Sequence, residues 1–115
     1  MVAYSLLIAI VNRGYSEKVM MAAQAAGARG GTVMHARGTG SLDATKVLGI
    51  TIEPEKDIIL ILTEKSARQD IMRAIYKEAG LTKEGRGIVI SLPVEDVIGS
   101  ANLITNTDTN TNTEQ

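Results

Sequence analysis

Three glycine-containing segments of the chain are suited to bind an anion through their backbone. They are Gly30-Gly31-Thr32, Arg37-Gly38-Thr39-Gly40 and Gly85-Arg86-Gly87, and each lies next to a run of residues typical of a strand. Glycine permits positive φ and close backbone approach, so these turns can present N–H groups to phosphate oxygens. Each segment alone is also an ordinary turn signal. We expect the three to converge on one sheet edge, and such convergence favours a ligand site.

The sequence contains little that supports catalysis or metal binding. His35 is the only histidine, and there is no cysteine. A lone imidazole lacks the partners of a metal site, so we interpret His35 as a structural residue, packed or partly exposed. No Ser-His-Asp constellation and no acidic pair within a motif is present. We therefore expect no catalytic residue, no bound metal and no enzyme activity; a small-molecule hydrolase would need a nucleophile or a general-base cluster.

Composition excludes further classes of protein. The 115 residues correspond to one domain, and 44% of them are hydrophobic, enough to form a core. Twelve Lys and Arg against 13 Asp and Glu give a net charge of −1, and only 3% of residues are aromatic. Such a chain is not expected to bind nucleic acid. Its apolar runs are shorter than the roughly 18 residues of a membrane span, and no basic leader precedes them, so we expect a cytoplasmic protein without membrane insertion.

Hydrophobic periodicity predicts the elements that position these segments. Apolar, β-rich runs over residues 4–11, 32–37, 57–63 and 88–92 predict four strands. A helix after the first strand is expected to have Ser16 as its N-cap and Gly27 at its end, and a helix after the third to begin with a capping box, Ser66 to Gln69. The helical stripes consist of Tyr15, Val19, Ala22, Ala23 and Ala26 in the first helix, and of Ile71, Ala74 and Ile75 in the second.

The order of these elements predicts the fold class. Residues 8–27 and 61–80 have the same strand-to-glycine spacing, so the chain reads as one βαβ unit written twice. This β-α-β-β-α-β order is typical of an α+β, ferredoxin-like sandwich, with a four-stranded antiparallel sheet and two helices on one face. The domain is expected over residues 1–104. The Thr- and Asn-rich segment 105–115 has no apolar side chain and is interpreted as a disordered tail.

We interpret the longest connection and the remaining charged residues as loop and exposed surface. The connection from Gly38 to Lys56 is longer than compact domains normally use. Its end, residues 53–57, is interpreted as a charged, solvated turn. Four cations of the second helix region are interpreted as an exposed face: Lys65, Arg68, Arg73 and Lys77.

The strands suggest that the chain associates with copies of itself. A sheet covered on one side should alternate apolar and polar residues, whereas residues 6–11 and 58–62 are apolar throughout. Two helices cover one face only, and burying each aliphatic side chain of the other face is worth about 1.5–3 kcal/mol. The tail is too polar to cover that face, and the connection has one short apolar patch, residues 47–50. We therefore expect an obligate oligomer.

Several short motifs, in their order and spacing, resemble the PII nitrogen-regulatory family of small trimeric signalling proteins, and more closely its divergent PII-like branch. The resemblance covers residues 4–100 or so. It rests on Gly31-Thr32-Val33, Arg37-Gly38-Thr39-Gly40, Pro54-x-Lys56, Thr82-x-x-Gly85-x-Gly87 and the segment from Leu92-Pro93 to Gly99.

The resemblance implies a homotrimer with adenine-nucleotide clefts between its subunits. The walls of each cleft would be formed by the B-loop, which is the Gly-x-Gly turn before the fourth strand, and by the glycines that end the second strand. The T-loop, residues 41–53 here, would dock on a transporter or enzyme. The implied nucleotide-binding residues are Thr32, Arg37, Gly38, Thr39, Gly40, Gly85, Arg86 and Gly87. The implied partner-binding residues are Ser41, Leu42, Asp43, Lys46, Val47, Leu48 and Ile50.

The sequence departs from the family at four cationic positions. Typical members have lysine or arginine where this chain has Ser41, Ile88, Gly99 and Ala101. Charge-assisted hydrogen bonds are about twice as strong as neutral ones, so a triphosphate loses affinity here, with Arg37, Lys83 and Arg86 as partial substitutes. The expected effector is an adenine nucleotide, with AMP, ADP or a cyclic nucleotide favoured over ATP, and no other cofactor.

Two functions follow from the sequence. The first is a non-enzymatic sensor in which the effector orders the T-loop and changes which partner it binds, an order–disorder switch in a PII-like regulator, with nitrogen metabolism as one setting. The second is a trimeric structural or adaptor module whose cleft has lost its ligand. The missing cations favour the second function, and the retained Gly-x-Gly turn favours the first.

Overall fold

The computed structural model describes residues 2–38, 45–47, 50–52, 55–83 and 86–99. The elements, in chain order, are β1 (Tyr4–Asn12), α1 (Ser16–Ala25), β2 (Thr32–Arg37), β3 (Thr45–Val47), β4 (Ile50–Ile52), β5 (Glu55–Glu64), a 3₁₀ turn (Lys65–Ala67), α2 (Arg68–Glu78) and β6 (Gly87–Val94). The expected tail, 105–115, lies outside the described residues. No helix among the described residues has the length and apolar character needed to cross a membrane.

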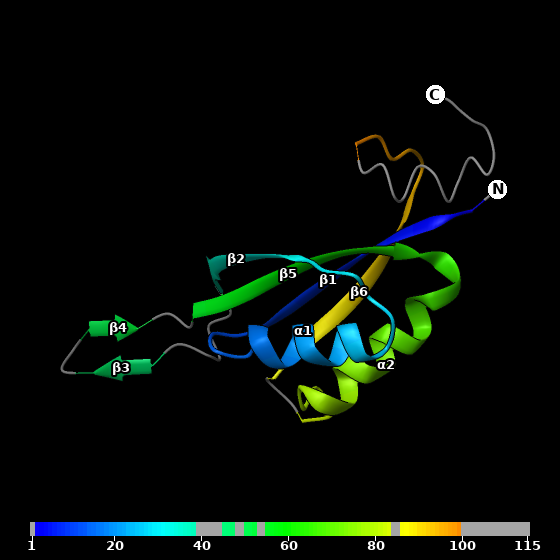
Figure 1. Ribbon diagram of the computed structural model, residues 1–115. Coiled ribbons are helices and arrows are strands. Elements are labelled where there is room, and N and C mark those ends of the chain that lie inside the picture. Colours follow the sequence, from blue (N-terminus) through cyan, green and yellow to red (C-terminus); the bar gives the residue numbers. More distant parts are fainter. Residues whose placement is uncertain (1, 39–44, 48–49, 53–54, 84–85, 100–115) are drawn as a thin grey trace.

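Four of the strands form one antiparallel sheet in the order β2-β5-β1-β6. The two helices lie side by side on one face of this sheet (Figure 1). This arrangement confirms the predicted ferredoxin-like fold of the α+β class. Because β2 and β6 are the two edge strands, the segments that flank β2 and those that flank β6 lie at opposite edges of the sheet.

The helix boundaries differ from the predicted capping. Ser16 is the first helical residue of α1, the preceding residue is Tyr15, and no side chain caps this end. The predicted capping box is also wrong, because Ser66 lies inside the 3₁₀ turn and α2 begins at Arg68 without a side-chain cap. The two glycines past the helix ends, Gly27 and Gly80, do have positive φ, as a helix-terminating glycine should.

The long connection contains a second, two-stranded sheet that the sequence analysis did not predict. β3 and β4 pair antiparallel, with Val47 opposite Ile50. In Figure 1 this ribbon reaches away from the end of the four-stranded sheet. The β-branched residues Thr45, Val47, Ile50, Thr51 and Ile52 are typical of strands, but each run has only three residues, too few for periodicity to show.

The core lies between the helices and the sheet. Alternate residues of β1 and β5 point toward the helices and are almost fully buried, among them Leu7 and Val11 of β1 and Ile59 and Ile61 of β5. Val19 of α1 and the α2 pair Ile71 and Ile75 close this core from the other side. Four residues of the predicted helical stripes therefore pack in this core: Val19, Ala23, Ile71 and Ile75. Each buried aliphatic side chain contributes about 1.5–3 kcal/mol. Ala22 and Ala74 of the same stripes lie instead at the contact between the two helices.

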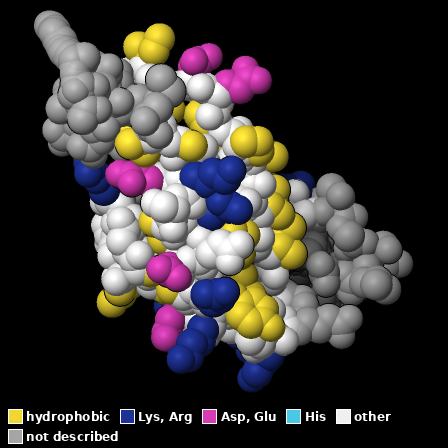
Figure 2. Space-filling view, turned by 90° about the vertical axis from the view of Figure 1, so that its right-hand side faces the viewer, with side chains coloured by type: hydrophobic (Ala, Val, Ile, Leu, Met, Phe, Trp, Pro, Cys, Tyr) yellow, Lys and Arg dark blue, Asp and Glu magenta, His cyan; other side chains and the backbone are white. Residues whose placement is uncertain are grey.

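The opposite face of the sheet carries no covering element among the described residues. Directly opposed residues of antiparallel strands share a face, so the register assigns its side chains. Ten large apolar side chains of this face are half-buried or exposed: Met34, Leu6, Ile8, Ile10, Ile58, Leu60, Leu62, Ile88, Ile90 and Leu92. We call this set the open face. In the space-filling view, hydrophobic side chains gather along one margin, apart from the Lys and Arg side chains in the middle (Figure 2).

Candidate functional site

The structure separates the three glycine segments instead of bringing them to one sheet edge. One row of paired residues crosses the sheet from His35 through Asp57 and Val11 to Gly87. The ends of β2 and β6 that carry Arg37-Gly38 and Arg86-Gly87 are thus at the same end of the sheet but at opposite edges. Three strand spacings put about 14 Å between them. Thr32 begins β2 at the other end, level with Leu60, so one chain does not assemble the predicted cleft.

Two of the glycines are required by close packing within the chain. Gly87 has a φ of +143°, and a Cβ on it would lie 2.3 Å from the carbonyl oxygen of Ile10. A Cβ on Gly31 would lie 2.8 Å from the carbonyl oxygen of Leu60. No side chain fits either position without movement of a neighbouring strand. Close packing within the chain therefore requires glycine at both positions, whether or not a ligand binds.

Arg86 is held by a contact with the start of α1. Its Nη1 donates a hydrogen bond to the Tyr15 hydroxyl at 3.0 Å, and its guanidinium lies 5.7 Å from the centre of the Tyr15 ring. The ammonium of Lys18 lies at the same distance, 5.7 Å, from that ring. Both cations are close enough for a cation–π interaction. This contact keeps positive charge beside the B-loop and fixes the direction of the Arg86 side chain.

A histidine–aspartate pair lies at the opposite edge of the same row. Asp57 is 2% exposed, and its Oδ1 is 2.8 Å from Nδ1 of His35, whose side chain is 71% exposed. The backbone N–H of Gly14 donates to Oδ2 of Asp57 at 3.1 Å. The interpretation of residues 53–57 as a solvated turn is therefore wrong at Asp57, because β5 begins at Glu55 and buries this carboxylate.

The surroundings of Asp57 keep its carboxylate ionised. Burial disfavours the charged form and by itself raises the pKa of Asp57. Hydrogen bonds from His35 and from the Gly14 N–H, with the positive charges of His35 and Arg13, outweigh burial and hold the pKa below its ordinary value. An ionised carboxylate has no proton to donate, so Nδ1 of His35 carries the hydrogen and donates it. The other ring nitrogen, Nε2, is left for other partners.

Charged side chains surround this pair at the end of β2 and β5. An open cleft of about 430 Å³ is lined by Arg13, His35, Ala36, Arg37 and Glu55. Arg13 and Glu55 form an ion pair across it. At the same end of the sheet but on its other face, Nζ of Lys56 donates to Oδ1 of Asn12 at 2.8 Å. Among the described residues, the lining of this cleft includes two guanidinium groups, the imidazole of His35 and the carboxylate of Glu55.

Several predicted site residues lie outside the described part of the chain. Of the nucleotide set, these are Thr39, Gly40 and Gly85. Of the T-loop set, they are Ser41, Leu42, Asp43 and Leu48, while Lys46, Val47 and Ile50 are described as strand backbone only. The predicted exposed face on and before α2 is confirmed except at Arg68, which is half-buried and donates to the Lys65 carbonyl.

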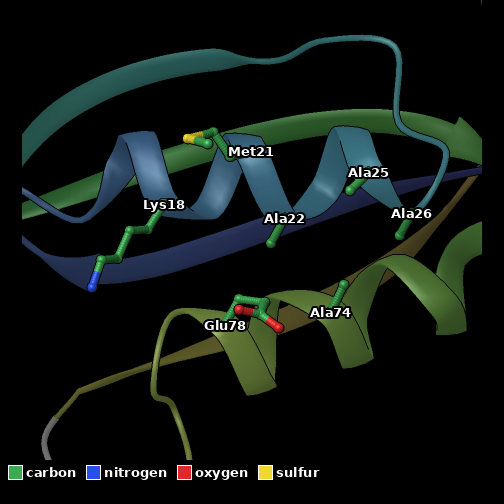
Figure 3. Close-up of a pocket in the computed structure, with 7 residues that line it drawn as sticks. All are labelled: Lys18, Met21, Ala22, Ala25, Ala26, Ala74 and Glu78. Carbon is green, nitrogen blue, oxygen red and sulfur yellow. The ribbon is translucent and has the colours of Figure 1, made fainter.

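A second hollow lies between the two helices, on the side away from the sheet (Figure 3). It has a volume of about 490 Å³ and is lined by Lys18, Met21, Ala22, Ala25, Ala26, Ala74 and Glu78. None of the residues predicted to bind a ligand or partner lines it. Its floor consists of alanines, which let two helices pack closely, so the hollow is explained by helix packing.

Comparison with known proteins agrees with the fold and the order of its motifs. The family described as "Nitrogen regulatory protein P-II" matches residues 4–101. A search of curated proteins found no match. The crystal structure of Arabidopsis thaliana PII bound to citrate is similar, with a TM-score of 0.63 and 26% sequence identity over 84% of this chain and 79% of that one. The chain belongs to the nitrogen regulatory protein P-II family, a family of regulatory proteins.

Proposed function

We propose that this chain is a PII-like sensor: a homotrimer, without enzyme activity, that binds an adenine nucleotide at its subunit boundaries and regulates a transporter or enzyme in nitrogen metabolism through residues 41–53. The observation that carries the proposal is the separation of the two Arg-Gly segments. Arg37-Gly38 and Arg86-Gly87 lie at one end of the sheet but on opposite edges. Each is half of a binding site, and a second copy of the chain supplies the other half.

The open face provides the driving force for assembly. Its ten apolar side chains are half-buried or exposed in one chain, with Ile88, Ile90 and Leu92 of edge strand β6 among the most exposed. Exposed apolar patches of this kind mark interaction surfaces. Packing the sheets of three copies against one another covers these side chains and brings a β2 edge to the β6 edge of a neighbouring copy.

The residues at the proposed boundary favour a ligand of modest charge. Arg86 and Arg37 supply positive charge, and the backbone of Gly87 and Gly38 is accessible at the strand ends. Ile88 and Gly99 stand where a more cationic site would place Lys or Arg. AMP, ADP or a cyclic nucleotide is therefore favoured over ATP. That the similar Arabidopsis protein was solved with citrate supports an anionic effector.

Calorimetric titration with AMP, ADP, ATP and cyclic AMP tests the nucleotide. Saturable binding of at least one of them is expected, and Arg86→Ala should weaken it by about tenfold or more, because hydrogen bonds to charged groups contribute about 1.5–3 kcal/mol. Arg73→Ala is the matched control, since Arg73 is an exposed cation on α2, away from the strand ends. Substitution of Gly87 is unsuitable, because any Cβ there meets the Ile10 carbonyl. No binding across the panel contradicts the proposal.

A trimeric adaptor without a nucleotide is the second candidate function. The hydrogen bond from Arg86 to Tyr15 favours it, because that bond occupies the B-loop cation within the chain. In this case the protein binds its partner with an affinity that no nucleotide changes. A pull-down of the partner with and without AMP or ADP distinguishes the adaptor from the sensor.

A further inference from the structure

We infer that Tyr15 holds the side chain of Arg86 inside its own subunit and thereby weakens ligand binding at the proposed subunit boundary. The inference rests on the proposed function, in which Arg86 supplies positive charge to a nucleotide, and it assigns the regulation of that site to Tyr15. A ligand at the boundary competes with Tyr15 for the same cation. We call the contact between Tyr15 and Arg86 the latch.

The strand order shows that the latched guanidinium lies away from the boundary. β6 is an edge strand, so its outer edge is the one that a neighbouring copy would meet, and β1 is its inner neighbour. Tyr15 follows the end of β1, where its backbone N–H donates to the carbonyl of Asn12 at 3.2 Å. The side chain of Arg86, which precedes β6, therefore reaches inward to the start of α1 and not outward across the edge.

Three interactions favour the latched position. Nη1 of Arg86 donates to the Tyr15 hydroxyl at 3.0 Å, and the guanidinium lies 5.7 Å from the centre of the ring. The same Nη1 lies 3.5 Å from the place that a Cβ on Gly80 would take, so the guanidinium is also close to the end of α2. The C-terminal end of a helix carries partial negative charge and attracts cations. In this position Arg86 is half-buried.

Release of the latch involves the Arg86 side chain and leaves the surrounding backbone in place. The backbone N–H of Arg86 donates to the carbonyl of Lys83 at 3.3 Å, and Gly87 packs closely against β1. The Tyr15 ring is half-buried and packs against the core. The ammonium of Lys18 lies 5.7 Å from the centre of the same ring, so the ring keeps a cation when Arg86 leaves.

The latch lowers the apparent affinity for a ligand, because only chains with a free guanidinium bind fully. Tyr15→Phe removes the hydroxyl that accepts the hydrogen bond and keeps the ring. Nucleotide binding should then tighten by about tenfold, the effect of one hydrogen bond to a charged group. The same variant should unfold at a lower urea concentration, because that hydrogen bond also stabilises the fold. A tyrosine with only a structural role would give the loss of stability without the gain in affinity.

Calorimetric titration of the unchanged protein and of Tyr15→Phe with AMP, ADP, ATP and cyclic AMP tests the latch. If both proteins bind and the variant binds about tenfold more tightly, the latch and the proposed function are both supported. Equal or weaker binding by the variant overturns the latch and leaves the nucleotide site standing. Binding by the variant alone supports the latch and identifies the unchanged chain as the adaptor. Binding by neither protein overturns both.

Two controls show whether the effect passes through Arg86. Tyr76→Phe makes the same chemical change at a tyrosine that is 51% exposed on α2, and it should leave the nucleotide affinity unchanged. In the Arg86→Ala protein, Tyr15→Phe should give no further gain, because the cation that the hydroxyl holds is gone. An equal gain in the Tyr76 variant, or a gain that persists without Arg86, would overturn the latch.

Discussion

Replacement of Ile90 by lysine tests whether the open face is buried between copies of the chain. Ile90 lies within β6, directly opposite Ile8 of β1, and points away from the helices. It is 40% exposed in the single chain, so lysine can be accommodated there without disturbing the core. In the proposed trimer the same position is enclosed by apolar side chains, and its neighbours across the strands, Ile8 and Leu60, offer an ammonium no hydrogen-bond acceptor.

The expected effect is large because it is repeated in each copy. Full burial of an aliphatic side chain is worth about 1.5–3 kcal/mol, so the two-fifths of Ile90 still exposed amounts to about 2–4 kcal/mol over three copies. Each uncompensated charge adds several kcal/mol of desolvation. Since about 1.4 kcal/mol corresponds to tenfold in an equilibrium constant, Ile90→Lys should raise the dissociation constant by several orders of magnitude.

Sedimentation velocity over a range of concentrations measures the outcome. The unchanged protein should sediment as a trimer and Ile90→Lys as a monomer, with far-ultraviolet circular dichroism showing that both are folded. Met21→Lys is the matched control, because Met21 is 67% exposed on α1, on the other side of the molecule. An unchanged protein that is monomeric at micromolar concentration, or an Ile90→Lys protein that remains trimeric, would refute the reasoning.

Three further substitutions test the fold itself. Gly87→Ala adds a Cβ 2.3 Å from the Ile10 carbonyl at a φ of +143°, so urea unfolding should show a loss of about 2–6 kcal/mol. Because folding lowers the pKa of Asp57, its contribution to stability is present above the unfolded value of about 3.9 and is lost as pH falls through the folded value. Asp57→Asn should therefore make the urea midpoint less dependent on pH below about 4, and an unchanged pH profile would contradict the ionised pair. Leu7→Ala opens a cavity beneath the helices and should cost about 2–5 kcal/mol in thermal or urea unfolding.

Much of the fold could be predicted because its elements are long and periodic. The continuous apolar, β-rich runs over residues 6–11 and 58–62, and the spacing of Ile71 and Ile75, are local features that appear directly in the chain. The helix starts could not be predicted as well. Ser16 and Ser66 are residue types typical of caps, but capping depends on the direction in which each chain segment leaves the sheet.

The candidate site was predicted less well, because its contacts join residues far apart in the chain. Asp57 looked like one of several charges before a strand, and only its pairing with His35 and the Gly14 N–H gives it a role. The one available signal was an acidic residue at the start of an apolar run, a position that an antiparallel neighbour can bury. Arg86 likewise meets Tyr15 across 71 residues, a separation at which no sequence pattern indicates contact.

The amino-acid sequence by itself determined the four strands of the main sheet, the two helices, their ferredoxin-like order and the excess of apolar residues in the strands, because hydrophobic patterning is a local property. The tertiary structure alone decided which glycine segments share an end of the sheet, and that the Arg37 and Arg86 segments occupy opposite edges. It also decided that His35 is oriented by a buried carboxylate. Strand order and register bring such residues together, and both depend on how the whole core packs rather than on neighbours in the chain.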